Sequence, residues 1–451
     1  FMSGDTSQFF ELPGGPVGFA VGAEYRKEKV FYDQDDFTQT GLSFYNGIGT
    51  FDPTSFEVKE AFGELRLPII RESFIHELTV NAAGRISDYK GATGTTYAYN
   101  AGVDFAPVRD LRLRANYSRA VRAPNLTDLF FPLSQNFAPA PQDPCALDFR
   151  NTPQRQANCA AAGVPANFNY QYKSSLAFQS GGNPNLQEEK SDSYTVGGVF
   201  QPRFLPGFSL TVDFYDITVN DVITSPTAQQ IINACYDAAS IDNQFCELFQ
   251  RQGAGTGPAG EITGRILENS LQVVPLNYAK LKVRGVDAEV AYRKKFAGLG
   301  SLSTKLTYTR VLKNDAFLNP LTPDLPNRAL FELGDPRDAF NFDVDLKSGP
   351  ITFGYDLRYI GKQVLNQYED FFSVGDQPPQ NADYADRRFY PAVFYHDVRL
   401  SIEAGKNFDF YMGIDNVLDR DPPLGLTGAG GGSAIFTNRG RFFYAGAVAR
   451  F

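Results

Sequence analysis

The feature that most constrains the fold of this chain is an alternation of apolar and polar side chains with a period of two. Residues 111–118 read Leu-Arg-Leu-Arg-Ala-Asn-Tyr-Ser, with an apolar or aromatic side chain at every odd position. The alternation recurs in residues 208–214, 340–346, 351–358 and 398–403. Because successive side chains of a strand point to opposite faces, these segments predict strands with one apolar and one polar face. No stretch approaches the roughly 18 apolar residues of a membrane-spanning helix, which excludes a helical membrane protein.

The connections between these strands alternate between short turns and long polar loops. Short turns are expected at residues 13–16, 107–110, 204–207, 347–350 and 405–407. Long loops are expected at residues 32–54, 121–187, 221–277, 314–336, 365–390 and 418–438. A soluble β-sandwich would explain the alternation, but it gives no reason for long loops at one end only. The pattern, with Tyr and Phe near the strand ends, predicts an all-β fold, a transmembrane antiparallel β-barrel.

Charge and composition narrow the function. The chain has 51 acidic and 42 basic residues and a net charge of −9. This balance argues against a nucleic-acid partner, because phosphate binding needs a surplus of Lys and Arg. The two histidines, His76 and His396, are far apart in the sequence, and no pairing of a nucleophile with a base stands out. We therefore expect no catalytic residue, no metal ligand, no cofactor and no enzymatic activity.

Several motifs, in this order along the chain, resemble the barrel of TonB-dependent outer-membrane receptors. They lie at residues 10–26, 117–126 (Tyr-Ser-Arg-Ala-Val-Arg-Ala-Pro-Asn-Leu), 183–191, 283–289 (Val-Arg-Gly-Val-Asp-Ala-Glu) and 413–419 (Gly-Ile-Asp-Asn-Val-Leu-Asp). The alternating segment from Arg441 to Phe451 resembles the terminal strand of bacterial outer-membrane barrels. The resemblance covers essentially the whole chain.

The resemblance implies a domain organisation and a location. Residues 1–451 are expected to be the C-terminal part of a barrel, about 14–15 strands of the about 22 that such transporters have. The N-terminal plug domain and the first strands of the family are expected to lie outside this sequence. Within the barrel, residues 121–187 and 221–277 are expected to be long extracellular loops. The expected location is the outer membrane of a Gram-negative bacterium, which the barrel crosses many times.

The resemblance also implies active transport. A ligand binds at the extracellular mouth, and the TonB complex pulls on the plug to release it into the periplasm. The expected partners are outer-membrane lipid or lipopolysaccharide, the plug domain, the TonB complex, a small nutrient and further outer-membrane subunits, but no nucleic acid. Aromatic and amide side chains in the loops favour a carbohydrate, with a ferric siderophore as the alternative. From other classes, a passive porin or a structural barrel component of a larger outer-membrane complex remains open.

The four cysteines form two local pairs in neighbouring loops. In an outer-membrane protein, which folds from the oxidising periplasm, Cys145 with Cys159 and Cys235 with Cys246 are expected to form disulfides. Residues 227–252 depart from the strand rhythm and show helical spacing, which predicts a short helix pair held by the second bridge. This segment is either a lid that contacts ligand or a packing unit that shapes the loop.

Six residues are candidates for contact with the ligand or the plug. Arg119, Arg122 and Asn125 lie where the motif at 117–126 leaves its strand, and they either face the lumen or form a capping network at the rim. Tyr170 and Tyr172 supply rings that suit the apolar faces of sugars. Asp33, with two more aspartates at 35 and 36, could belong to a calcium cluster, but an acidic solvated loop is the simpler interpretation.

Overall fold

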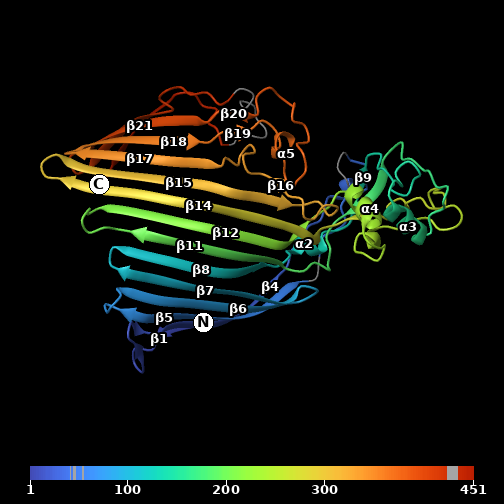
Figure 1. Cartoon of the computed structure of the whole chain (residues 1–451), viewed down its shortest axis with the longest axis horizontal. Helices are drawn as coiled ribbons and strands as arrows, with labels where there is room; N and C mark the ends of the chain where they lie inside the picture. Colours follow the sequence, from blue (N-terminus) through green and yellow to red (C-terminus); the bar gives the residue numbers. More distant parts are fainter. Residues whose placement is uncertain (41, 44–46, 53–54, 424–434, 451) are drawn as a thin grey trace.

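The structure, a computed structural model, describes the chain except residues 41, 44–46, 53–54, 424–434 and 451. Its main body is one antiparallel sheet that curls along its length, with the long loops gathered at one end of the strands (Figure 1). The strands follow one another along the sheet in chain order, apart from the short strands of the loops and turns, and β16 is added beside β15. This up-and-down order is that of a transmembrane barrel wall.

The strands on the main path of the sheet have these bounds: β1 (Met2–Asp5), β4 (Gly18–Glu28), β5 (Phe56–Arg71), β6 (Glu77–Tyr89), β7 (Gly94–Val108), β8 (Leu111–Arg122), β11 (Glu189–Phe200), β12 (Phe208–Thr224), β14 (Leu276–Phe296), β15 (Gly300–Phe317), β17 (Asp338–Ser348), β18 (Ile351–Ile360), β21 (Val393–Ala404), β22 (Phe408–Asp415) and β23 (Phe442–Ala449). Most span at least the roughly 9–11 residues needed to cross a bilayer. β12, β14 and β15 are longer, with 17, 21 and 18 residues, so they continue past the membrane towards the loops.

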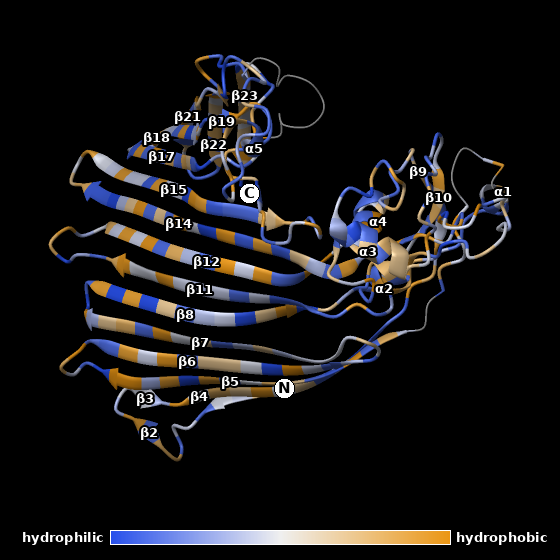
Figure 2. Ribbon diagram, turned by 45° about the vertical axis from the view of Figure 1, so that its right-hand side comes forward, coloured by the Kyte–Doolittle hydropathy of each residue, from blue (hydrophilic) through white to orange (hydrophobic). Residues whose placement is uncertain are grey.

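The two faces of the sheet carry different side chains, as the alternation predicts. Arg114 on β8 pairs with Asp213 on β12 across the intervening strand, at 2.8 Å from Nε to Oδ1. Their sequence neighbours Leu113 and Val212 point to the opposite face and are exposed. Figure 2 shows this alternation as bands of blue and orange along the strands. The charged face is therefore the lumenal one, and the apolar face meets lipid.

The short turns lie where the sequence places them, and glycine is required at some of them. Gly207, just before β12, has φ +89°, and a Cβ there would lie 1.9 Å from the carbonyl oxygen of Arg293. Gly349, between β17 and β18, has φ +55°. Only glycine adopts such backbone geometry at little cost, so these residues allow the strands to reverse within a few positions.

The loops at the other end contain the helices and the remaining short strands. The helices are α1 (Asp36–Gln39), α2 (Leu126–Phe130), α3 (Pro153–Ala161), α4 (Ala228–Asp237), η1 (Cys246–Leu248) and α5 (Tyr368–Phe371). The short strands there are β9 (Ser134–Ala138), β10 (Leu176–Ser180), β13 (Gln272–Val273), β16 (Asn327–Arg328), β19 (Gln363–Val364) and β20 (Phe389–Tyr390). Two further short strands, β2 (Glu11–Leu12) and β3 (Gly15–Pro16), lie outside these loops and form the hairpin at residues 11–16. None of the helices in the described part of the chain is long and apolar enough to cross a membrane.

The helical content of the loops is wider than the sequence analysis expected. The sequence pattern predicts one helix pair, in residues 227–252, where the structure has α4 and the single turn η1. The preceding loop also contains a helix, α3, that was not expected. It begins at Pro153 after Thr152, whose hydroxyl accepts from the amide of Arg155. Proline at the first position after a threonine cap is a local helix-start signal that the long-loop interpretation overlooked.

Candidate functional site

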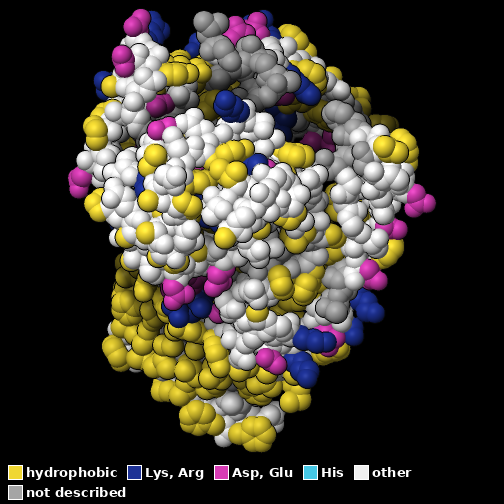
Figure 3. Space-filling model, turned by 90° about the vertical axis from the view of Figure 1, so that its right-hand side faces the viewer, with side chains coloured by type: hydrophobic (Ala, Val, Ile, Leu, Met, Phe, Trp, Pro, Cys, Tyr) yellow, Lys and Arg dark blue, Asp and Glu magenta, His cyan; other side chains and the backbone are white. Residues whose placement is uncertain are grey.

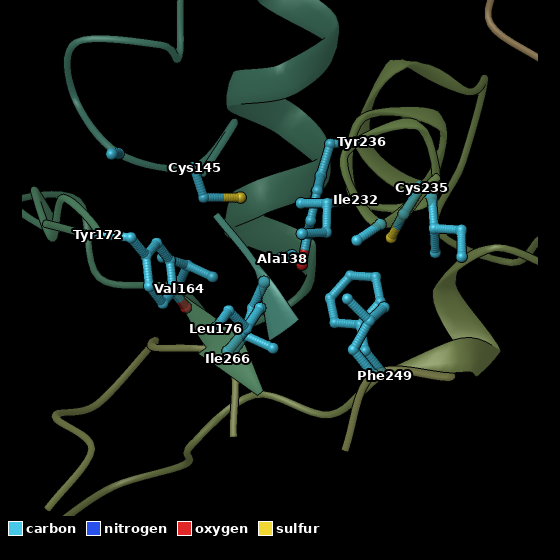
Figure 4. Close-up of a cluster of buried hydrophobic side chains, with 14 of the residues drawn as sticks. Ala138, Cys145, Val164, Tyr172, Leu176, Ile232, Cys235, Tyr236, Phe249 and Ile266 are labelled. Atoms are coloured by element: carbon cyan, nitrogen blue, oxygen red, sulfur yellow. The ribbon is translucent and has the colours of Figure 1, made fainter. Parts of the chain in front are cut away.

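The two loops that contain the cysteines fold together into one compact unit, which we call the loop unit (residues 134–180 and 225–275). β10 of the first loop pairs with β9 and also, in parallel, with β13 of the second loop. α3 and α4 lie side by side, where Arg155 binds Asp237 at 2.6 Å. Figure 4 shows the apolar side chains, from both loops, that converge between these elements. The loop unit therefore has a core of its own, separate from the barrel wall.

Two disulfides and a buried ion pair hold the loop unit. The bridges are Cys145–Cys159 and Cys235–Cys246, the two local pairs that the sequence predicts. Arg251 binds Asp143 through both nitrogens of its fork, at 2.7 and 2.8 Å, although the side chains are only 7% and 0% exposed. Burial alone would lower the pKa of Arg251, but the Asp143 carboxylate and the Tyr236 hydroxyl raise it above its ordinary value. The pair therefore stays charged inside the unit.

Tyr170 and Tyr172 belong to this core. Their rings meet edge to face at 4.9 Å, and the guanidinium of Arg265 lies 4.6 and 5.5 Å from the two ring centroids. Tyr172 is 8% exposed. Burial, and to a smaller degree the negative charge of Asp143, raises the pKa of its hydroxyl. Its hydroxyl has no hydrogen-bond partner among the described residues. The Tyr172 ring is thus buried in the loop unit, and the half-buried Tyr170 ring packs against Tyr172 and Arg265.

The structure separates Arg119 from Arg122, which the sequence analysis placed together. Arg122 binds Glu189 at 2.7 Å and Asp128 at 2.9 Å on the lumenal side of the rim. Asn125 caps α2: its side-chain oxygen accepts from the amide of Asp128 at 2.8 Å. These two residues form a capping network at the rim.

Arg119 lies on the opposite face of β8. It shares that face with Tyr117, two positions earlier, and both side chains bind Asp192 on β11. By alternation, this face also carries Leu113 and lies on the lipid side, whereas Arg114 and Arg122 lie on the other face. The interpretation that Arg119 grips ligand or plug from the lumen therefore does not fit its position. The motif alone could not show this, because a charge on an apolar face at the strand end breaks the alternation.

Asp33 accepts hydrogen bonds from residues of its own loop. Its Oδ1 accepts from Gln39 and from the Thr50 hydroxyl, each at 2.8 Å. Asp35 caps α1 by accepting from the amide of Thr38 at 3.0 Å. In the part of the chain that the structure describes, no group of three His, Cys, Asp or Glu side chains could hold a metal ion. The observed contacts are those of a hydrogen-bonded acidic loop.

A cleft that the sequence analysis missed lies between the loops 318–337 and 365–388. It has a volume of about 470 Å³, and Leu325, Phe372 and Val374 supply part of its apolar wall. Amide side chains supply much of the rest: Asn319, Asn327, Gln367, Gln377 and Gln380. No Lys or Arg side chain belongs to its described lining. The local sequence signal was the density of Asn, Gln and Pro in both loops, but only the structure brings the loops together.

Glu369 gives this cleft an unused acceptor. The residue is 8% exposed, and its Oε1 accepts from the amide of Arg328 at 2.5 Å. Its other carboxylate oxygen is buried and has no partner in the described structure. Leaving such an oxygen unpaired costs free energy, which a ligand hydroxyl or N–H group would recover once the side chain turned this oxygen into the cleft. The cleft is therefore a candidate binding site for a ligand with several hydrogen-bond donors.

More carboxyl groups lie behind the cleft. The Oε1 of Glu332 accepts from the amide of Tyr368, the first residue of α5, at 3.0 Å. Burial raises the pKa of Glu332 above its ordinary value, and the neighbouring Glu369, Asp335 and Asp370 add to this. Burial likewise raises the pKa of Asp335. Protonation of these groups is thus easier in the folded loops than in water.

These features together define an outer-membrane β-barrel wall with a charged lumenal face and structured extracellular loops. A model of the β-barrel of TonB-dependent receptors matches residues 1–417. The chain belongs to this family, and the family resides in the outer membrane. No curated protein matches the chain by sequence.

Solved structures share the fold at low sequence identity. The ferric enterobactin receptor of Pseudomonas aeruginosa, in complex with enterobactin, superposes with a TM-score of 0.60 at 16% identity, over 96% of this chain and 52% of its own. The siderophore receptor PirA of Acinetobacter baumannii gives a TM-score of 0.58 at 14% identity, over 98% and 53%. The chain thus spans about half the length of the structures that it matches.

Proposed function

We propose that this chain is the barrel part of a receptor that takes up a small nutrient across the outer membrane by active, TonB-dependent transport. The observation that carries the proposal is the family match over residues 1–417 on a sheet with a charged lumenal face. A wide barrel would otherwise be an open hole, so a plug domain and the TonB complex are the proposed partners. The proposed work is binding and gating, without covalent chemistry.

In this proposal, residues 1–451 form one part of the barrel, and residues 121–187 and 221–277 are extracellular loops. The loop unit is the proposed lid, because its elements lie beyond the ends of β12 and β14, at the loop end (Figures 1 and 2). Figure 3 looks onto this end and shows hydrophobic side chains gathered on the flank below the loops. A rigid, disulfide-linked lid would move as one body over the mouth.

The ligand class that we place first is a ferric siderophore. Two of the solved structures that share the fold are a ferric enterobactin receptor, solved with enterobactin, and a siderophore receptor. A siderophore of low net charge would suit the cleft at Glu369, whose lining lacks Lys and Arg. Its amide N–H groups could donate to the unpaired carboxylate oxygen.

A carbohydrate is the second candidate, and the chemistry of the cleft favours it. Amides and a carboxylate bind sugar hydroxyls, while a ring such as Phe372 packs against the apolar face of a sugar. The expectation based on Tyr170 and Tyr172 no longer supports this candidate, because both rings are used inside the loop unit. The cleft supports it instead.

The test combines binding and uptake. Purified receptor is titrated with a neutral ferric hydroxamate, a ferric catecholate and a maltooligosaccharide, and uptake of the tightest ligand is followed in cells with and without the inner-membrane proton gradient. We expect a ferric siderophore to bind tightest and its uptake to stop when the gradient collapses. Binding of the oligosaccharide alone would replace the first candidate with the second. Uptake that persists without the gradient would instead favour a passive porin.

The role of the cleft is tested separately with Glu369→Gln. Because an amide keeps one acceptor but offers a donor where the free oxygen was, we expect ligand affinity to fall about tenfold, or about 1.4 kcal/mol. Asp324→Asn, at an exposed carboxyl of the neighbouring loop, is the matched control and should leave affinity unchanged. Equal affinity in the two variants would remove the cleft from the proposed site without touching the transport proposal.

A further inference from the structure

On the lipid-facing side of the sheet, the outward side chains change sharply from apolar to charged near the extracellular end. On β17 the outward side chains run Leu346, Val344, Phe342 and Phe340, and the next one is Asp338. On β15 the outward Tyr308 is followed by Arg310, and both side chains bind Asp338, at 2.6 and 3.4 Å. Arg119 and Asp192 follow outward-facing tyrosines in the same way. The apolar band therefore ends at these rings, and an aqueous, charged layer begins directly above them.

A cavity of about 480 Å³ lies at this boundary, where β17 and β18 leave the sheet. Asp338 and Tyr359 belong to its wall, and the Tyr359 ring stacks on lipid-facing Phe340 at 4.9 Å. The aromatic side chains of Phe331, Phe389 and Tyr390 line it above. Because two wall residues sit on the outward face of the sheet, the cavity adjoins the membrane and is distinct from the cleft at Glu369.

Three cations line this cavity: Arg337, Lys362 and Arg387. None of them forms an ion pair in the described structure, and the one carboxylate of the wall, Asp338, is paired with Arg310. Arg337 lies 5.7 Å from the Phe331 ring, and Lys362 lies 4.2 Å from the Phe389 ring. The Nε of Arg337 is buried without a hydrogen-bond acceptor. In a chain with a net charge of −9, this is a local surplus of positive charge that lacks its counter-charge.

The chemistry of this cavity suits a phosphorylated group. A guanidinium offers paired N–H donors that match phosphate oxygens, and an ammonium adds a compact positive charge. The aromatic wall suits the ring of an attached sugar or the start of an acyl chain. A free inorganic anion has no apolar part, so it would gain nothing from contact with the aromatic wall or from a position beside lipid-facing rings.

We propose that this cavity binds the phosphorylated headgroup of a glycolipid of the outer leaflet, lipopolysaccharide, with Arg337, Lys362 and Arg387 as its phosphate ligands. The acyl chains would then lie along Phe340 and Tyr359 on the barrel wall. Such a lipid would hold the loops 318–337 and 365–388, which also form the cleft, against the membrane surface.

The test counts lipid bound to the purified receptor. Wild type and Arg337→Gln/Lys362→Gln/Arg387→Gln are exchanged into detergent, titrated with lipopolysaccharide and analysed by native mass spectrometry. We expect wild type to retain one lipopolysaccharide and the triple variant to bind it at least tenfold more weakly. Arg284→Gln, at an outward-facing arginine already paired with Asp216, is the matched control and should bind as wild type does. Unchanged binding by the triple variant would overturn the proposal.

Two further arms identify the source of the phosphate. Lipopolysaccharide whose phosphates have been removed enzymatically should bind at least tenfold more weakly than the intact lipid. Inorganic phosphate at millimolar concentration should not displace the lipid. Equal binding of the dephosphorylated lipid, or full displacement by phosphate, would each contradict the proposal. Heat-modifiable migration of every variant verifies that the barrel is folded, and Lys362→Gln alone, at an exposed side chain, gives a milder variant.

Discussion

Single residues in the loop unit connect segments that are distant in the sequence. Arg251 binds Asp143, which is 108 positions earlier, and also donates to the carbonyl of Gly264 at 2.6 Å. The rings of Tyr236 and Phe249 lie 4.9 and 5.8 Å from its guanidinium. A buried charge is tolerated only when it is paired and hydrogen-bonded, so this arginine depends on Asp143.

Removing the partner should therefore damage the loop unit and spare the barrel. We expect Asp143→Asn to destabilise the unit by about 3–5 kcal/mol, because it leaves the Arg251 charge buried and uncompensated. The measurement is hydrogen exchange of the β10 amides, with heat-modifiable migration as the readout for the barrel. Lys173→Met, at an exposed cation of the same unit, should shift exchange by no more than about 0.5 kcal/mol.

The double variant Asp143→Leu/Arg251→Met gives a further outcome at the same site. Replacing both charges with apolar side chains should recover most of the loss, since no buried charge then remains. If the double variant is as unstable as Asp143→Asn, the packing of the site and not its charge balance would be the cause.

The contact between the loop 318–337 and α5, in the loop 365–388, depends on pH through Glu332. The folded-state pKa of this carboxyl is raised, chiefly by burial, so its protonated form favours the folded loops. The stabilisation is fully present below the unfolded pKa of about 4.3 and is lost as pH rises through the folded pKa. At neutral pH, the charged Glu332 consequently weakens the contact between the loop 318–337 and α5.

Glu332→Gln should remove this pH dependence. An amide oxygen can still accept from the amide of Tyr368, but it carries no charge, so we expect α5 to be more stable at pH 7, by less than about 1 kcal/mol. The difference from wild type should vanish near pH 4. Exchange of the Tyr368 amide, corrected for its intrinsic pH dependence, measures both. An identical change in Asp324→Asn would assign the effect to net charge instead of to this carboxyl.

The molecule as a whole depends on the register that places apolar side chains outward on every strand. A shift of one residue would exchange the two faces of a strand. The register pairs Val212 of β12 with Gly198 of β11 and Ala288 of β14, and it pairs Thr211 with Val199 and Glu289. Val212 and Thr211, adjacent on β12, therefore allow the lipid-facing and the lumenal side of one strand to be tested separately.

We expect Val212→Lys to lower the stability of the folded barrel by about 2–4 kcal/mol, because it puts a charge into the lipid near mid-membrane. Thr211→Lys should cost far less, since its new ammonium would lie beside Glu289 on the lumenal face. Urea unfolding of both variants in lipid vesicles measures the difference. Equal losses would contradict the assignment of the faces.

Much of the barrel could be predicted from the sequence because its signals are local. Alternation, glycine turns and the two cysteine pairs each depend on residues close together in the chain, and the structure has strands, turns and bridges at those places. The family motifs likewise lie within single strands or their ends, and the family model matches residues 1–417.

The sites were decided by the tertiary structure. Only the packing of two loops buries Tyr172 and half-buries Tyr170, and only the meeting of residues 319–327 with 367–380 forms the cleft at Glu369. The face on which Arg119 lies follows from its contact with Asp192 on the next strand, not from its motif. Strand period is a property of the local backbone, whereas these arrangements depend on which distant segments the sheet brings together, and no short stretch of sequence encodes that.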